Sequence, residues 1–224
     1  YYSAGADVLA LILERVTIES IPNYLSKNIF DPLEMHDTGY NLNGLQSQRV
    51  MKLHSRDENN KVMRHKHQVP TSRNTVFGGT HGLFSTADDY AKFCLMILHN
   101  GSWKGTRILK AETVKNIRTN HTQNLYNELG AGFGFGFSVI LNSDKMDRPG
   151  GVGQLQWGGY FSTHFFIDPK KRQLVSPLPS KCLVEITLLP PFKTIPTKPW
   201  TKSLLGIHKH PHAHVHSSLV GLKK

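Results

Sequence analysis

The spacing of apolar residues predicts helices in the first part of the chain. From about Ala6, apolar residues recur at three- and four-residue steps, which predicts a helix with one apolar stripe formed by Val8, Leu9, Ile12, Leu13 and Val16. After Ser20, a suitable N-cap, a second helix is expected to run to about Phe30, where Asp31-Pro32 stops it. Residues 41–75 are polar and predict mainly loop with short strands.

The clearest helix pattern begins after the turn-rich residues 78–82. Ser85 or Thr86 can cap it, and two acidic residues in its first turn suit the helix dipole. Asn100-Gly101 is a typical C-terminal stop, and a further helix is expected from Leu109 to about Thr119. The capped helix carries a stripe that we expect to be buried, formed by Tyr90, Phe93, Cys94 and Ile97.

Strand patterns follow the helices. Phe133, Phe135 and Phe137 alternate with glycines, which predicts one strand with a bulky face and a bare face. Two further strands, joined by a glycine-rich step, are expected at 154–159 and 163–167. Helices first and strands last predict an α+β fold, with an antiparallel sheet packed beside a helical layer.

The positive charge of the chain is concentrated near its end. The 224 residues carry 27 Lys and Arg, 16 Asp and Glu, and a net charge of +11. Residues 1–169 hold 17 of these basic and 15 of the acidic residues (net +2), whereas 170–224 hold ten and one (net +9). A body close to neutral does not indicate a nucleic-acid-binding protein. We therefore expect a folded body at 1–169 and a basic, poorly ordered tail at 170–224.

Seven of the 12 prolines lie in that tail, together with five alternating histidines. Imidazoles on one side of an extended chain can bind zinc, copper or nickel, whereas a solvated low-complexity tail is the other interpretation. The histidines are His208, His210, His212, His214 and His216.

Two further observations exclude classes of protein. The presence of only two cysteines excludes a disulfide scaffold and a four-cysteine zinc site. No apolar run reaches the length of a membrane span.

Four stretches of the sequence stand out as motifs: 2–9 (YSAGADVL), 29–39 (IFDPLEMHDTG), 78–90 (GGTHGLFSTADDY) and 157–160 (WGGY). Together they resemble the serine β-lactamase-related superfamily of class C β-lactamases, penicillin-binding DD-peptidases and esterases. Their order and spacing over 1–169 make the resemblance specific, although Glu34 stands where glycine is usual and Ala4 where the lactamase motif has asparagine. The Tyr-Ser form of the first stretch and the Trp-Gly-Gly form of the fourth lean toward the esterase-like members.

The resemblance implies a catalytic role for some of these residues and no cofactor. Enzymes of this family acylate a serine on a small-molecule ester, amide or peptide. Tyr2 would be the general base or proton relay, and the backbone N–H of Tyr160 would donate to the oxyanion. Trp157, Gly158 and Gly159 would form the wall of the substrate cleft.

The family's Ser-x-x-Lys pair is absent from the printed sequence, because no serine is followed by lysine three residues later. In the family this segment precedes the tyrosine motif, with which the chain opens. The sequence therefore predicts the C-terminal portion of a serine hydrolase that is inactive alone. The alternative is a non-catalytic remnant or binding module with a basic, metal-binding tail.

Overall fold

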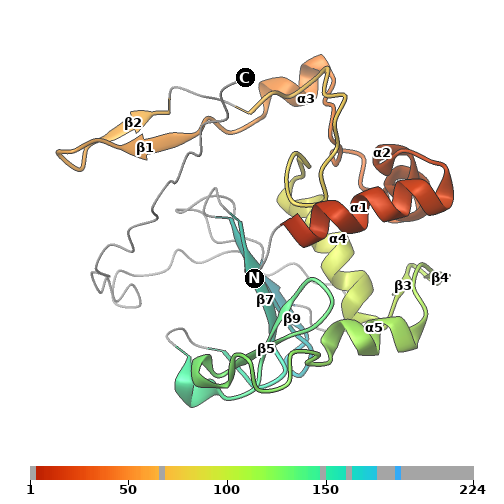
Figure 1. Cartoon of the computed structure of the whole chain (residues 1–224), viewed down its shortest axis with the longest axis vertical. Helices are drawn as coiled ribbons and strands as arrows, with labels where there is room; N and C mark the ends of the chain where they lie inside the picture. The colour runs from red at the N-terminus through yellow and green to blue at the C-terminus, as the bar shows by residue number, and fades with distance from the viewer. Residues whose placement is uncertain (1–3, 66–68, 147–149, 160–162, 176–184, 188–224) are drawn as a thin grey trace, which may run out of the picture.

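The computed structural model describes residues 4–65, 69–146, 150–159, 163–175 and 185–187. Its helices lie mainly in the first half of the chain, and Figure 1 shows α4 between the first two helices and α5. They are α1 (Ala4–Thr17), α2 (Ile21–Leu25) with a π-helical continuation η1 (Ser26–Phe30), α3 (Gly44–Gln48), α4 (Ala87–Leu98) and α5 (Ala111–Arg118), with short 3₁₀ turns at Asn127–Leu129 and Ser143–Lys145.

A six-stranded antiparallel sheet follows, in the order β10-β9-β8-β7-β6-β5. Sequential strands pair as neighbours, as short connections favour. This arrangement confirms the α+β prediction. The strands are β5 (Ala131–Phe133), β6 (Ser138–Ile140), β7 (Leu155–Gly158), β8 (His164–Asp168), β9 (Gln173–Val175) and β10 (Glu185–Thr187), and two separate hairpins pair β1 (His54–Arg56) with β2 (Val62–Arg64) and β3 (Ser102–Trp103) with β4 (Thr106–Arg107).

The main core joins helices α4 and α5 to the sheet. Ile97 and Val114 from the helices and Leu155 and Ile167 from the sheet are fully buried in one cluster. Cys94 lies in the same cluster, and burial raises the pKa of its thiol to about 12. A buried thiol of this kind packs like a small apolar side chain, as the stripe on this helix predicts.

Helix α4 has the expected ends. The Thr86 side chain accepts a hydrogen bond from the Asp89 backbone N–H at 3.2 Å. At the other end Gly101 has a φ of +89°, and its N–H donates to the Met96 carbonyl oxygen at 2.8 Å. Both signals were local, so the sequence was sufficient to predict them.

The alternating phenylalanines do not form one strand, so that prediction was wrong. The chain turns between β5 and β6, where the Gly134 N–H donates to the Phe137 carbonyl oxygen at 2.8 Å and Gly136 has a φ of +82°. Phe137 is buried, whereas 56% of Phe135 is exposed. Glycine at the turn permits a backbone conformation that breaks the alternation.

Two other expectations change. Ser20 precedes α2, but its side chain makes no capping hydrogen bond, and a different acceptor, Glu14 Oε1, binds the first N–H of the helix, that of Ile21, at 2.9 Å. The polar segment 41–75 has the short strands β1 and β2, and also helix α3, whose capping box joins Asn43 to Gln46. That box is a recognisable signal for a helix start.

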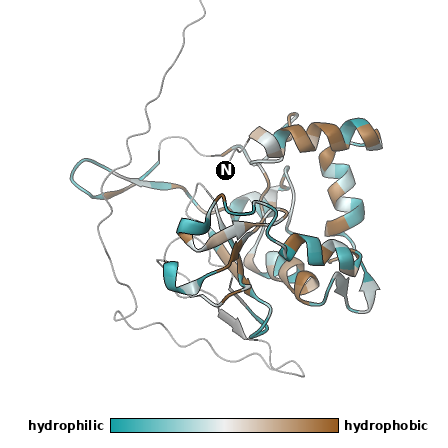
Figure 2. Ribbon diagram, turned by 60° about the horizontal axis from the view of Figure 1, so that its bottom comes forward, coloured by the Kyte–Doolittle hydropathy of each residue, from teal (hydrophilic) through white to brown (hydrophobic). Residues whose placement is uncertain are grey.

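Helix α1 is confirmed, but most of its apolar stripe is exposed. Leu9 and Val16 are 67% and 75% exposed, and Ala10 is the buried residue of this helix. Figure 2 shows α1 as a largely hydrophobic helix at the outside of the molecule.

The sheet continues beyond position 169 into β9 and β10. The alternating histidines, with the rest of 188–224, lie outside the described residues, so the division at 169 and the order of the tail stay predictions. Within the described parts of the chain, no helix has both the length and the apolar character needed to cross a membrane.

Candidate active site

The glycine-rich loop 78–83 lies directly on helix α1, which begins two residues after Tyr2. A Cβ atom placed on Gly79 would be 2.2 Å from the Ala6 carbonyl oxygen, so only glycine allows this approach. A Cβ atom on Gly78 would be 2.9 Å from Asp7 Oδ1. The two glycines therefore hold the loop against the helix that follows the tyrosine motif.

Asp7 adds a polar contact between the same two segments. Its Oδ1 accepts a hydrogen bond from the Thr80 backbone N–H at 2.9 Å, across 73 positions of sequence. The hydrogen bonds from Thr80 hold the pKa of the Asp7 carboxyl below its usual value. Sequence reasoning missed this role, although Asp7 lies within the stretch that resembles the tyrosine motif.

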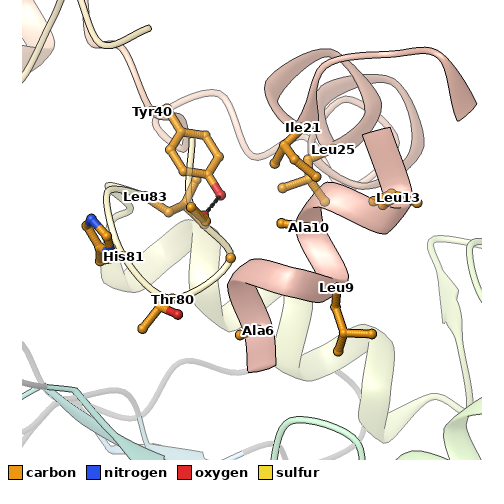
Figure 3. A pocket seen from close by; sticks show the side chains of 12 residues that line it. Ala6, Leu9, Ala10, Leu13, Ile21, Leu25, Tyr40, Thr80, His81 and Leu83 are labelled. Atoms are coloured by element: carbon orange, nitrogen blue, oxygen red, sulfur yellow. Dashed lines mark hydrogen bonds between the residues drawn. The ribbon is translucent and has the colours of Figure 1, made fainter. Parts of the chain in front are cut away.

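An apolar pocket of about 450 Å³ opens between helices α1 and α2 and this loop. Figure 3 shows Ala10, Ile21 and Leu25 on one side of it, with Leu83 and Tyr40 on the other. The Tyr40 hydroxyl donates to the Gly78 carbonyl oxygen at 2.8 Å and so fixes the start of the loop.

A buried carboxylate anchors the Asp-Thr-Gly end of the second motif to helix α4. Asp89 Oδ2 accepts hydrogen bonds from the Asp37 N–H at 2.7 Å and the Thr38 hydroxyl at 2.9 Å. Its Oδ1 pairs with Lys92 Nζ at 2.8 Å. A single bridge between Gly39 and Phe84 continues this contact toward the glycine loop. This motif is therefore part of the scaffold beside the candidate site.

Trp157 lies on strand β7, in the interior of the sheet. It pairs with Phe165 on β8, and its ring meets the Phe133 ring edge-on with the centroids 4.9 Å apart. The side chain is partly buried, with some surface exposed. That arrangement is compatible with a cleft wall, and the role of Trp157 in substrate binding stays a prediction.

Gly158 and Gly159 have close neighbours within the chain itself. A Cβ atom on Gly158 would be 2.6 Å from His164 Nδ1, and one on Gly159 would be 2.4 Å from Thr163 Oγ1. The Gly159 N–H also donates to the Thr163 carbonyl oxygen at 2.7 Å. Packing against the returning strand therefore accounts for both glycines, and their contact with substrate stays a prediction.

Tyr2 and Tyr160, the two expected catalytic tyrosines, lie outside the described residues. The structure thus brings together the glycine loop, Asp7 and Tyr40 near the start of α1, and it places Trp157 separately on the sheet. Among the described residues no group of three or more His, Cys, Asp or Glu side chains could hold a metal ion.

Comparison with known sequences identifies the family. The profile described as "Beta-lactamase" matches residues 1–180. Protein Rv1367c of Mycobacterium tuberculosis is 32% identical over 184 residues, which cover 75% of this chain and 45% of that protein. A lovastatin esterase of Penicillium rubens is 27% identical over 194 residues, which cover 75% of this chain and 47% of the esterase. The chain spans about half the length of these relatives.

Solved structures agree on the fold. EstCE1, a hydrolase with promiscuous acyltransferase activity, superposes with a TM-score of 0.68 at 23% identity, covering 80% of this chain and 50% of that one. The octameric penicillin-binding protein homologue from Pyrococcus abyssi superposes with a TM-score of 0.61 at 19% identity. The superposition covers 79% of this chain and 37% of that one. The family model and the sequence relatives confirm the resemblance seen in the four sequence motifs. The chain belongs to the beta-lactamase family.

Proposed function

We propose that this chain is the portion of a serine hydrolase that supplies the tyrosine and the glycine-rich strand to a shared active site. The enzyme would cleave an ester or amide through an acyl-serine. Relatives described as an esterase and as a putative D-alanyl-D-alanine carboxypeptidase support this substrate class.

The observation that carries the proposal is the fixed position of the helix that follows Tyr2. Ala6 and Asp7 on α1 are held by Gly79 and Thr80 of the glycine loop, which is itself fixed by Tyr40. A catalytic base must be within hydrogen-bond reach of the group that it deprotonates. A rigid helix directly after Tyr2 supports such positioning.

In the proposed reaction the Tyr2 phenolate takes the proton from the serine hydroxyl while the serine oxygen attacks the substrate carbonyl. The Tyr160 backbone N–H donates to the oxyanion that develops. Collapse of the tetrahedral intermediate breaks the bond between the carbonyl carbon and the alcohol or amine, which leaves with the proton from Tyr2. Water then hydrolyses the acyl-serine. A free tyrosine has a pKa of about 10, so the phenolate needs a nearby cation, which the family's Ser-x-x-Lys lysine supplies.

Since the printed sequence has no Ser-x-x-Lys pair, we propose that these 224 residues are inactive on their own. The test is incubation of the purified chain with a fluorescent penicillin and with a p-nitrophenyl ester, beside a Tyr2→Phe variant. The expected result is background signal from both proteins. Covalent labelling or ester turnover above the Tyr2→Phe background would refute the proposed inactivity.

A further inference from the structure

Hairpin β1–β2 stands apart from the two buried clusters of the protein. Figures 1 and 2 show it projecting from the rest of the described chain, and no described residue between 51 and 65 belongs to either cluster. The side chains from position 58 to 65 are all exposed. A two-stranded hairpin alone is only marginally stable in water, so contacts outside a core must hold this one in place.

Polar contacts fix the turn and the base of the hairpin. At the turn, Asp57 Oδ1 accepts hydrogen bonds from the backbone N–H groups of Asn59 at 3.0 Å and Lys61 at 2.8 Å. Below the base, the Leu42 N–H donates to the Thr71 carbonyl oxygen at 2.7 Å, which joins the two ends of the segment. The hairpin is therefore presented at the surface in a defined conformation.

The excess positive charge of residues 1–169 lies in this hairpin. Residues 52–65 carry four basic and two acidic side chains, whereas the rest of 1–169 carries 13 of each and is neutral. One of the two acidic residues, Asp57, is engaged in the turn. A local excess of positive charge on an otherwise neutral body fits an anionic partner. The basic residues are Lys52, Arg56, Lys61 and Arg64.

Apolar side chains lie among these basic residues. Met51, Val62 and Met63 are 49%, 54% and 47% exposed. His54 pairs with Arg64 in the strand register, and residues two apart in a strand lie on the same face, so His54, Val62 and Arg64 share one face. We call these three residues the hairpin face. Neither strand contains an acidic residue.

From these observations we propose that hairpin β1–β2 docks on the surface of an anionic phospholipid membrane, with the hairpin face toward the lipid. Basic residues are attracted to anionic headgroups, and apolar side chains beside them enter the boundary between headgroups and acyl chains. A single-stranded nucleic acid fits less well, because its bases stack on aromatic rings and residues 51–65 contain no Phe, Tyr or Trp. This peripheral contact goes beyond the proposed hydrolase function and does not depend on it.

The test is co-sedimentation of the whole chain with vesicles of phosphatidylcholine containing about 30% phosphatidylserine, beside vesicles of phosphatidylcholine alone. The charge variant is Lys61→Gln/Arg64→Gln. Its matched control is Lys110→Gln/Lys115→Gln, which removes two exposed basic residues from helix α5 and its N-cap. The apolar variant is Val62→Thr, which keeps a β-branched side chain suited to a strand. Residues 170–224, with a net charge of +9, are present in every protein, so their attraction to the vesicles is common to all.

We expect the wild-type chain and the control variant to bind the anionic vesicles with equal affinity, and vesicles of phosphatidylcholine alone much more weakly. The charge variant should bind at least about tenfold more weakly than wild type, because it loses two basic residues near an anionic surface. Val62→Thr should bind about threefold more weakly, because less apolar surface enters the lipid. The urea midpoint should be the same in all four proteins, since the substituted side chains are exposed.

Three results would overturn the inference. The wild-type chain could fail to sediment with anionic vesicles, or could bind both kinds of vesicle equally. The charge variant could bind as tightly as its control, which would assign the attraction to overall charge. Val62→Thr could bind as tightly as wild type, which would remove the hairpin face from the contact. Binding of the wild-type chain to DNA but not to vesicles would also overturn it and assign the basic hairpin to nucleic acid.

Discussion

The buried Asp89 carboxylate offers a stringent test of how the family motifs are held together. Replacing Asp89 with alanine removes the acceptor for the Asp37 N–H and the Thr38 hydroxyl, and leaves Lys92 without its carboxylate. Removing one partner of a buried ion pair costs about 3–5 kcal/mol. The Lys92 side chain is 26% exposed and also donates to the Glu34 carbonyl oxygen, so the lysine keeps a partner and some contact with water. The expected cost therefore lies at the low end of that range. We predict a loss of about 3 kcal/mol in the free energy of unfolding.

The assay is urea unfolding followed by circular dichroism. Asp88→Ala is the matched control, because Asp88 is exposed and lies in the same first turn of α4. The Asp88→Ala substitution should lower the free energy of unfolding by no more than about 1 kcal/mol, because it removes only a favourable interaction with the helix dipole. If Asp89→Ala were destabilised by no more than Asp88→Ala, the buried carboxylate would not anchor the second motif, and our account of the scaffold would be wrong.

Two further predictions concern the contacts around the glycine loop. Gly79→Ala should lower the free energy of unfolding by about 1–3 kcal/mol, since its Cβ would lie 2.2 Å from the Ala6 carbonyl oxygen. Gly44→Ala, where a Cβ meets no atom within 4 Å, should be neutral or stabilising, and equal effects of both substitutions in urea unfolding would refute the close approach. Hydrogen bonds from Thr80 lower the pKa of Asp7, and a hydrogen bond from Arg49 lowers the pKa of Asp37. The two ionised carboxylates therefore stabilise the fold above the ordinary carboxyl pKa, and this stabilisation is lost as the pH falls through the lowered values. The urea concentration at the unfolding midpoint should decrease as the pH is lowered from 5 to 3, and it should decrease by less in Asp7→Asn; an equal decrease in both proteins would contradict this role of Asp7.

Local signals accounted for much of the fold. Helix α4 could be predicted because its cap at Thr86 and its stop at Gly101 are encoded by adjacent residues. The β5–β6 turn could not, because glycine is compatible with both a bare strand face and a turn, and the Gly136 backbone decided between them. Ser20 is a suitable cap by type, but its side chain makes no capping hydrogen bond, and Glu14, seven residues before Ile21, accepts from the first N–H of the helix.

The candidate site was predictable in part. The four motifs identified the family and the α+β fold, yet they did not reveal that Asp7 and Tyr40 fix the glycine loop, because those contacts join residues 73 and 38 positions apart. Nor could the sequence show that the apolar stripe on α1 is left open, since periodicity identifies a face and not what covers it.

Ester hydrolysis by the assembled halves tests the central claim most directly. The chain is mixed with the part of Rv1367c that lies outside its matched span, and p-nitrophenyl ester turnover is compared with that of each component alone and of a mixture containing Tyr2→Phe. The account predicts turnover only in the mixture, reduced about 10²–10⁴-fold by Tyr2→Phe, the usual contribution of a positioned general base. Turnover by this chain alone, or an assembled complex whose rate is unaffected by Tyr2→Phe, would contradict it.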